Sequence, residues 1–131
     1  MPAAASAAVL SEPDALAVRQ VVEAQLDAFA ADDAERAFSY ASPSIRAQFG
    51  DADTFMGMVR VGYPMVLRPA AVSFFKSQMV GGSNTTVSQP VHLRDREGRL
   101  WLATYTLERQ AGVGWRIDAC VVVADSGRSL T

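Results

Sequence analysis

Three residue types that often carry chemistry are nearly absent: this 131-residue sequence has one cysteine, one histidine and one lysine. Cys120 has no second cysteine for an internal disulfide, which leaves the redox compartment open. Together with His92 it is too little for a Cys/His metal cluster, so we expect no metal and no cofactor. No Gly-x-Ser-x-Gly motif is present to expose a nucleophilic serine, which disfavours hydrolysis through a Ser/His/Asp triad.

No excess of charge of one sign is present either. The 14 acidic and 12 basic residues give a net charge of -2, so no overall field would attract nucleic acid or an acidic membrane. No apolar run approaches the roughly 18–20 residues that cross a bilayer. We therefore expect a soluble protein with neither nucleic acid nor membrane as a partner.

The chain is long enough for one domain, and half of its residues are hydrophobic, as in a globular protein. Residues 1–10 lack the basic and apolar regions of a signal peptide and are expected to form a flexible arm. Their alanine-rich composition is also typical of the C-terminal end of a signal peptide, near its cleavage site. Cytoplasmic location is thus the default expectation, and an exported mature form is the alternative. A single domain is expected over residues 11–125, followed by a C-terminal tail over 126–131.

Signals for helices fill the first half of the chain. Helix starts are expected where a side chain can cap the first turn: Ser11, Asp32, Ser42, and Asp51 or Asp53. Gln25 falls on the apolar stripe of the first helix. Its amide either binds backbone or reaches into a cleft, and backbone is favoured because buried amides normally have partners.

The second half alternates with a period of two in four runs, 72–79, 85–94, 100–109 and 115–124. Short glycine-containing turns separate these runs, which predicts an antiparallel meander. Pro90 lacks the ladder donor and is expected at an edge or a bulge. Helices followed by such strands predict an α+β fold, with N-terminal helices packed on a four-stranded antiparallel sheet.

Alternation also assigns side chains to the two faces of this sheet. The side toward the helices should hold Trp101, Ala103, Tyr105 and Leu107, with Trp115, Ile117, Ala119, Val121 and Val123. The outer side should hold an apolar group: Leu100, Leu102, Cys120 and Val122. Because apolar patches usually mark contacts, we expect a homodimer packed through the sheet.

Six segments carry a resemblance to a known family: 21–29 (VVEAQLDAF), 37–43 (AFSYASP), 48–50 (QFG), 55–56 (FM), 105–110 (YTLERQ) and 115–120 (WRIDAC). They resemble a bacterial family catalogued as domain of unknown function 4864. Its architecture is similar to the nuclear transport factor 2-like (ketosteroid isomerase-like, cystatin-like) superfamily. The resemblance implies a cone, in which a curved sheet wraps a long helix and leaves a pocket at the open end. Members of that superfamily include proton-transfer enzymes, hydratases, epoxide hydrolases and non-catalytic binding modules, so the fold does not fix the function.

A proton-transfer or hydratase-type enzyme would need a carboxylate or histidine base and a tyrosine in the pocket. The candidates are Asp118, His92, Tyr40 and Tyr63. Alternation argues against both bases. Asp118 lies between two residues assigned to the helix side and should face outward, paired with an arginine, while His92 should be an exposed histidine.

A non-catalytic module that binds a small apolar ligand or a peptide is therefore the favoured function, and such an enzyme is the alternative. Aromatic side chains suit an apolar pocket with few orienting contacts. Those expected to line it are Tyr40, Phe55, Tyr63, Trp101, Tyr105 and Trp115.

Overall fold

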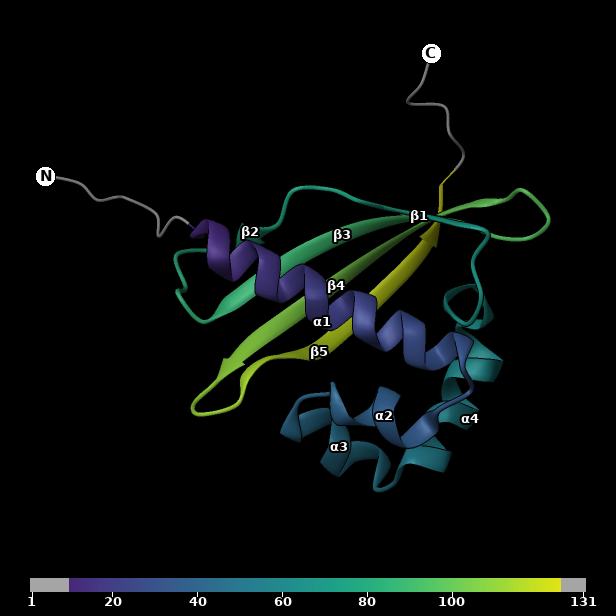
Figure 1. Ribbon diagram of the computed structural model, residues 1–131, viewed down its shortest axis with the longest axis horizontal. Helices are drawn as coiled ribbons and strands as arrows, with labels where there is room; N and C mark the ends of the chain where they lie inside the picture. Colours follow the sequence, from purple (N-terminus) through teal and green to yellow (C-terminus); the bar gives the residue numbers. More distant parts are fainter. Residues whose placement is uncertain (1–9, 126–131) are drawn as a thin grey trace, which may run out of the picture.

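The computed structural model describes residues 10–125 (Figure 1). The expected arm, apart from Leu10, and the expected tail lie outside the described residues. Four helices come first: α1 (Glu12–Ala30), α2 (Ala34–Ser39), α3 (Pro43–Phe49) and α4 (Ala52–Gly62). A 3-10 turn over Pro64–Val66 leads to the strands β1 (Ala71–Phe74), β2 (Gln78–Met79), β3 (Thr86–Arg94), β4 (Leu100–Gln110) and β5 (Gly114–Ala124). The predicted α+β fold, with helices preceding an antiparallel sheet, is confirmed.

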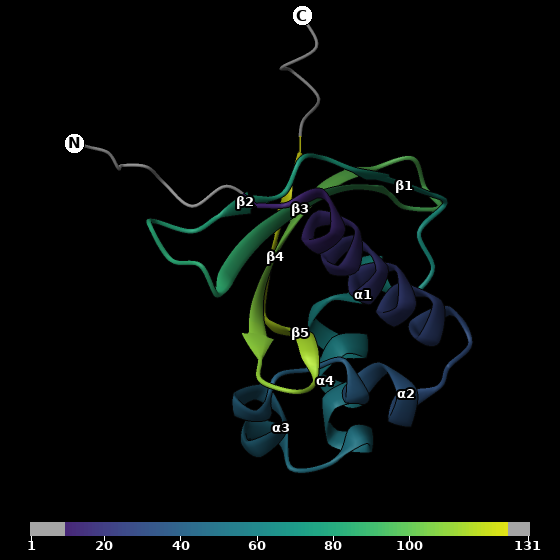
Figure 2. The same cartoon turned by 60° about the vertical axis from the view of Figure 1, so that its left-hand side comes forward.

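The sheet has the order β1-β3-β4-β5, and β2 also pairs with β3. Every pairing is antiparallel. The strand expected over 72–79 is therefore two short strands on one edge of β3. All four helices lie on one side of the curved sheet, and its other side carries no helix in the described part of the chain (Figure 2).

The break between β1 and β2 lies opposite Pro90, which has no amide hydrogen for the ladder. Phe74 pairs with Val91 and Gln78 pairs with Ser88. The three residues between β1 and β2 therefore lie opposite only two residues of β3, 89 and 90. The buried side chain of Gln89 supplies the missing donor: its Nε2 donates to the carbonyl oxygens of Phe75 at 2.8 Å and Pro90 at 2.9 Å. Pro90 was expected at a sheet edge or at a bulge, and this irregular pairing opposite it confirms the second of these.

Capping side chains set the helix starts. Ser11, Ser42 and Asp51 each accept a hydrogen bond from an amide three residues on, as expected. The prediction that Asp32 caps α2 is wrong. It adopts a positive φ of 56° and its carboxylate binds Arg60 at 2.6 Å, while Asp33 accepts from the amide of Arg36 at 3.1 Å. The chain reverses at Asp32, so the first side chain that can reach an amide of α2 is one residue later.

The core lies between α1, α2, α4 and the inner face of β3 and β4. The ring of Phe55 is its centre on the helical side, with ring centroids of Phe29, Phe38 and Phe49 at 6.2, 5.4 and 5.7 Å. The Nε2 of buried Gln25 donates to the carbonyl oxygen of Ala37 at 3.1 Å, which joins α1 to α2. The backbone bond expected for this amide is confirmed.

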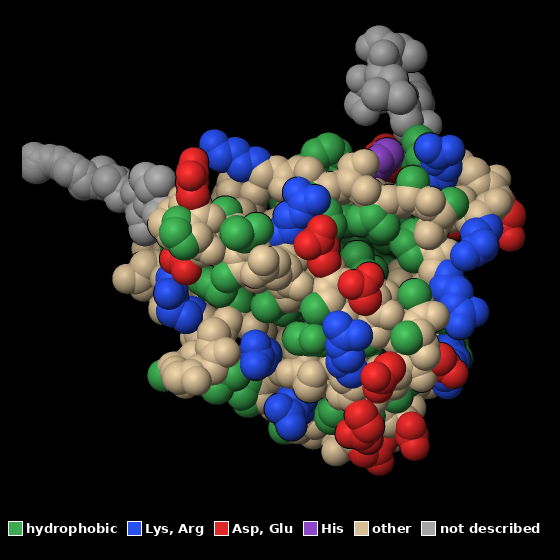
Figure 3. All heavy atoms as spheres, viewed as in Figure 1, with side chains coloured by type: hydrophobic (Ala, Val, Ile, Leu, Met, Phe, Trp, Pro, Cys, Tyr) green, Lys and Arg blue, Asp and Glu red, His purple; other side chains and the backbone are tan. Residues whose placement is uncertain are grey.

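Charged side chains of both signs are interspersed with apolar ones on the face that α1 crosses, and acidic ones gather at the end formed by α2 and α4 (Figure 3). Within residues 10–125, no helix has the length and apolar character needed to span a membrane.

Candidate functional site

The site begins with a bulge in β5. Thr106 pairs with Ala119 but Leu107 pairs with Ile117, so Asp118 has no partner on β4. One extra residue reverses the inward and outward alternation of everything after it. Cys120 and Val122 consequently pack against the core, while Val121 and Val123 are 60% and 50% exposed. The faces expected for these four side chains were therefore wrong.

The bulge also turns Asp118 toward the helices. The Ser42 hydroxyl donates to Oδ1 of Asp118 at 2.7 Å, and the Ser42 amide donates to the carbonyl oxygen of Ile117 at 2.8 Å. The amide of Ile117 in turn donates to the carbonyl oxygen of Tyr40 at 2.8 Å. These bonds fasten the junction of α2 and α3 to β5. The expectation that Asp118 is an outward-facing partner of an arginine is wrong.

Asp118 lies on the wall of a cavity of about 280 Å³ between the helices and the end of the sheet. The helices, the segments that connect them and the Pro64–Val66 turn supply Gln25, Phe29, Ala41, Ile45, Gln48, Phe49, Phe55, Met58, Val59, Tyr63 and Val66. The strands supply Tyr105, Ile117, Asp118, Ala119 and Cys120. Most of this wall is apolar, and Asp118 is the only carboxylate that the described part of the chain contributes to it.

Three of the six aromatic residues predicted for a pocket lie on this wall: Phe55, Tyr63 and Tyr105. The other three are not among its lining residues. The hydroxyl of Tyr40 accepts from Nε of Arg36 at 3.3 Å, and the indole of Trp101 donates to Asp95 at 3.0 Å. Contact of any of these rings with a ligand stays a prediction.

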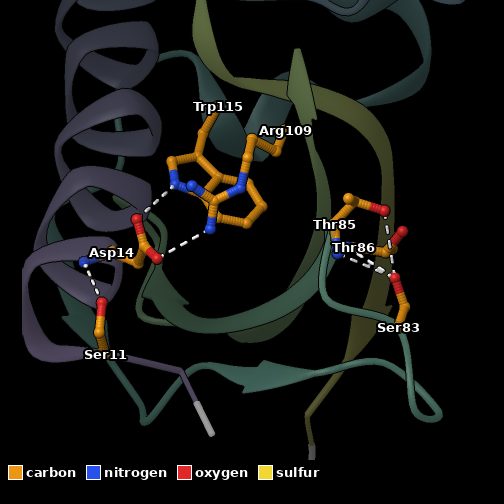
Figure 4. Close-up of polar contacts among 7 residues, drawn as sticks. All are labelled: Ser11, Asp14, Ser83, Thr85, Thr86, Arg109 and Trp115. Carbon is orange, nitrogen blue, oxygen red and sulfur yellow. Dashed lines mark hydrogen bonds and ion pairs between the residues drawn. The ribbon is translucent and has the colours of Figure 1, made fainter. Parts of the chain in front are cut away.

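Trp115 instead belongs to a cluster at the start of α1 (Figure 4). Asp14 accepts from Nη2 of Arg109 at 2.8 Å and from the Trp115 indole at 3.4 Å. The Arg109 guanidinium lies 4.6 Å from the centroid of the Trp115 ring. The hydrogen bond from Arg109 lowers the pKa of Asp14, and the hydrogen bond from Trp115 lowers it by less. Burial acts in the opposite direction but does not cancel this effect. This cluster fastens α1 to the ends of β4 and β5.

Tyr105 and Cys120 face each other across β4 and β5 on the cavity wall. Burial raises the pKa of Tyr105 well above its usual value and raises that of the Cys120 thiol to about 12. The Tyr105 hydroxyl is buried and makes no hydrogen bond within the described chain, although the thiol is near enough to affect its pKa. Both groups are neutral near pH 7, so Cys120 is not an activated nucleophile.

His92 lies away from the cavity, on the outer side of the sheet. Its Nε2 lies 2.9 Å from Oδ2 of Asp125, and its ring centroid lies 6.1 Å from that of Phe75. The imidazole is 27% exposed, so His92 is half-buried on the outer side and not the exposed histidine that was expected. Of the four catalytic candidates, only Asp118 and Tyr63 share the cavity.

Sequence reasoning missed several polar side chains of the wall, among them Gln48 and Cys120. Gln48 lies in the last turn of α3, the helix whose start at Ser42 was predicted. Cys120 could not be found from alternation, because the bulge lies between it and the inward-facing Ile117. No group of three histidine, cysteine, aspartate or glutamate side chains within residues 10–125 could hold a metal ion.

Residues 11–130 match the model of a family described as a domain of unknown function, DUF4864. No curated protein matches the chain.

Proposed function

The chain belongs to the DUF4864 family, whose description names no activity, and we propose that it is a non-catalytic module that binds a small apolar ligand. The observation that carries this proposal is the cavity of about 280 Å³ with a mostly apolar wall. Ligand sites are typically concave and apolar with a few polar groups, which is the composition of this wall. Its size favours a small molecule over a peptide.

Filling the cavity tests this proposal. Met58 lies on the wall and is half-buried, so Met58→Trp places a large ring in the ligand space. We expect this variant to bind 2-phenylethanol, an apolar probe, at least about tenfold more weakly than the unmodified protein, as measured by NMR titration. Val61→Trp is the matched control, because Val61 lies on the same helix and is 87% exposed. Equal binding by both variants would refute the proposal, as would no binding by the unmodified protein.

A proton-transfer enzyme is the second candidate, and one observation favours it. Asp118 and Tyr63 line the same cavity, so a carboxylate base and a phenol could act on one molecule there. Such an enzyme should catalyse exchange of the hydrogen next to the carbonyl of cyclohexanone in D2O, and Asp118→Asn should abolish that exchange. If exchange does not exceed the buffer rate at probe concentrations that fill the cavity, the enzyme is refuted and the binding module remains as the proposed function.

The protein is also proposed to form a homodimer through an apolar outer patch, which consists of Phe75, Leu102, Val121 and Val123. Leu102 pairs with Val123 on β5 and with His92 on β3, whose ring lies beside Phe75. Phe75, Val121 and Val123 are each at least half exposed. The patch holds no charged side chain, so a second copy would meet no like charge there, whereas a charged partner would find nothing to pair with.

The nuclear transport factor 2-like architecture, the bacterial origin and the cytoplasmic location stay predictions. The helices on one side of a curved sheet (Figure 2) support the first of these, as does the cavity between helices and sheet.

A further inference from the structure

We infer that the ligand of this cavity is an amine with an apolar body, whose ammonium group binds beside Asp118. This inference rests on the proposed binding function and names the chemical class of the ligand. Three observations carry it: the charge of the wall, the contacts of Asp118 and the rings that surround the cavity.

The wall carries one formal charge. Asp118 is its only acidic residue, and none of its other lining residues is lysine, arginine or histidine. The remaining titratable groups include the buried phenol of Tyr105 and thiol of Cys120, which are neutral near pH 7. An anionic ligand would therefore meet a carboxylate and no compensating cation.

Asp118 itself lacks a cationic partner within residues 10–125. Its one hydrogen bond comes from the Ser42 hydroxyl to Oδ1, and none of the ion pairs between described residues includes it. Asp118 is half-buried, and the β5 bulge places it on the cavity wall. Because a carboxylate can accept several hydrogen bonds, it can still take bonds from an ammonium group.

The rest of the wall suits the apolar body of such an amine. Phe29 and Phe49 both pack against Phe55, with ring centroids at 6.2 and 5.7 Å, and all three rings line the cavity. Aromatic faces attract cations as well as apolar groups, so these rings do not oppose a charged end. An alcohol of the same shape would gain the apolar contacts but not the ionic one.

Calorimetric titration with three matched probes tests this inference. 2-Phenylethylamine, 2-phenylethanol and 3-phenylpropanoate place an ammonium, a hydroxyl and a carboxylate on similar apolar bodies. We expect the unmodified protein to bind the amine at least about tenfold more tightly than the alcohol, because hydrogen bonds to charged groups are the stronger ones. The carboxylate should bind most weakly.

Asp118→Asn then assigns the preference to one side chain. The amide keeps an oxygen that can accept from Ser42, so the fold should be retained, and binding of the alcohol should stay within about twofold. The preference for the amine should fall to within about twofold as well. Glu108→Gln is the control. It removes the same charge from a residue that does not line the cavity, and it should keep the preference.

The outcomes separate the two proposals. Equal binding of amine and alcohol, both weakened by Met58→Trp, would overturn the cationic ligand and keep the binding cavity. Tighter binding of the carboxylate would overturn it in the same way, as would an amine preference that survives Asp118→Asn. No binding of any probe would overturn both proposals.

Discussion

The hydroxyl of Ser42 donates a 2.7 Å hydrogen bond to the carboxylate of Asp118, and these two residues lie 76 positions apart in the chain. The same hydroxyl accepts from the amide of Ile45 at 3.3 Å and so caps α3. One side chain thus starts a helix and holds the bulged carboxylate of β5 at the cavity. The position of α3 and the polarity of the cavity are therefore set together.

Loss of this hydroxyl should destabilise the protein. Ser42→Ala removes the cap of α3 and leaves a half-buried carboxylate without its donor, so the free energy of unfolding should fall by about 1–2 kcal/mol in urea titrations. Ser11→Ala is the comparison, because Ser11 caps α1 through an exposed hydrogen bond from the amide of Asp14. We expect a smaller loss there, and equal losses would show that the bond to Asp118 contributes nothing.

The Asp14 cluster should make stability depend on acid pH. The Arg109 hydrogen bond lowers the pKa of Asp14 in the folded state below its usual value. A depressed folded pKa contributes stability that is present above the unfolded pKa and is lost as the pH falls through the folded pKa. The unfolding free energy of the unmodified protein should thus exceed that of Asp14→Asn by a constant amount from about pH 7 to about pH 5, and the difference should shrink below about pH 4.

The arginine side of this cluster provides the control. Arg109→Met removes the cause of the lowered pKa, so further replacement of Asp14 in that background should change the acid dependence much less. A difference between the unmodified protein and Asp14→Asn that persists unchanged to pH 2 would contradict this account.

The hydrogen bonds of Gln89 should stabilise the fold in addition to the packing of its side chain. Gln89→Leu leaves the carbonyl of Phe75 without a donor opposite Pro90, and the unfolding free energy should fall by about 1–3 kcal/mol. Pro90→Ala restores a backbone N–H at the same place. In a double-mutant cycle it should therefore recover at least about 0.5 kcal/mol of the loss, and simple additivity of the two changes would count against the bridging role.

Local chemistry made much of this fold predictable. The side chains that begin α1, α3 and α4 were identified because a capping oxygen needs no distant partner. Alternation placed Ala103, Tyr105 and Leu107 on the buried face of β4 correctly. Both signals act within a few residues of the chain.

The candidate site was less predictable, because it depends on one register shift. No glycine or proline marks the bulge at Asp118, and its position depends on how β5 meets β4 and the loop before α3. A strict period of two therefore predicted that Asp118 faces away from the cavity and that Cys120 lies on the outer face. Pro90, in contrast, carried its own signal for an irregular position.

The last prediction concerns the apolar outer patch, which the same shift redefines, since it brings Val121 and Val123 to the outer side. If two copies pack through this patch, Val121→Lys would bury an unpaired charge at the contact, and sedimentation velocity should show a monomer where the unmodified protein is a dimer. Val61→Lys is the control, because Val61 is 87% exposed on α4, a helix on the other side of the sheet (Figure 2). That variant should sediment as the unmodified protein does. A monomer for the unmodified protein at high concentration would rule out the dimer, because the patch is exposed and nothing else in the described chain covers it.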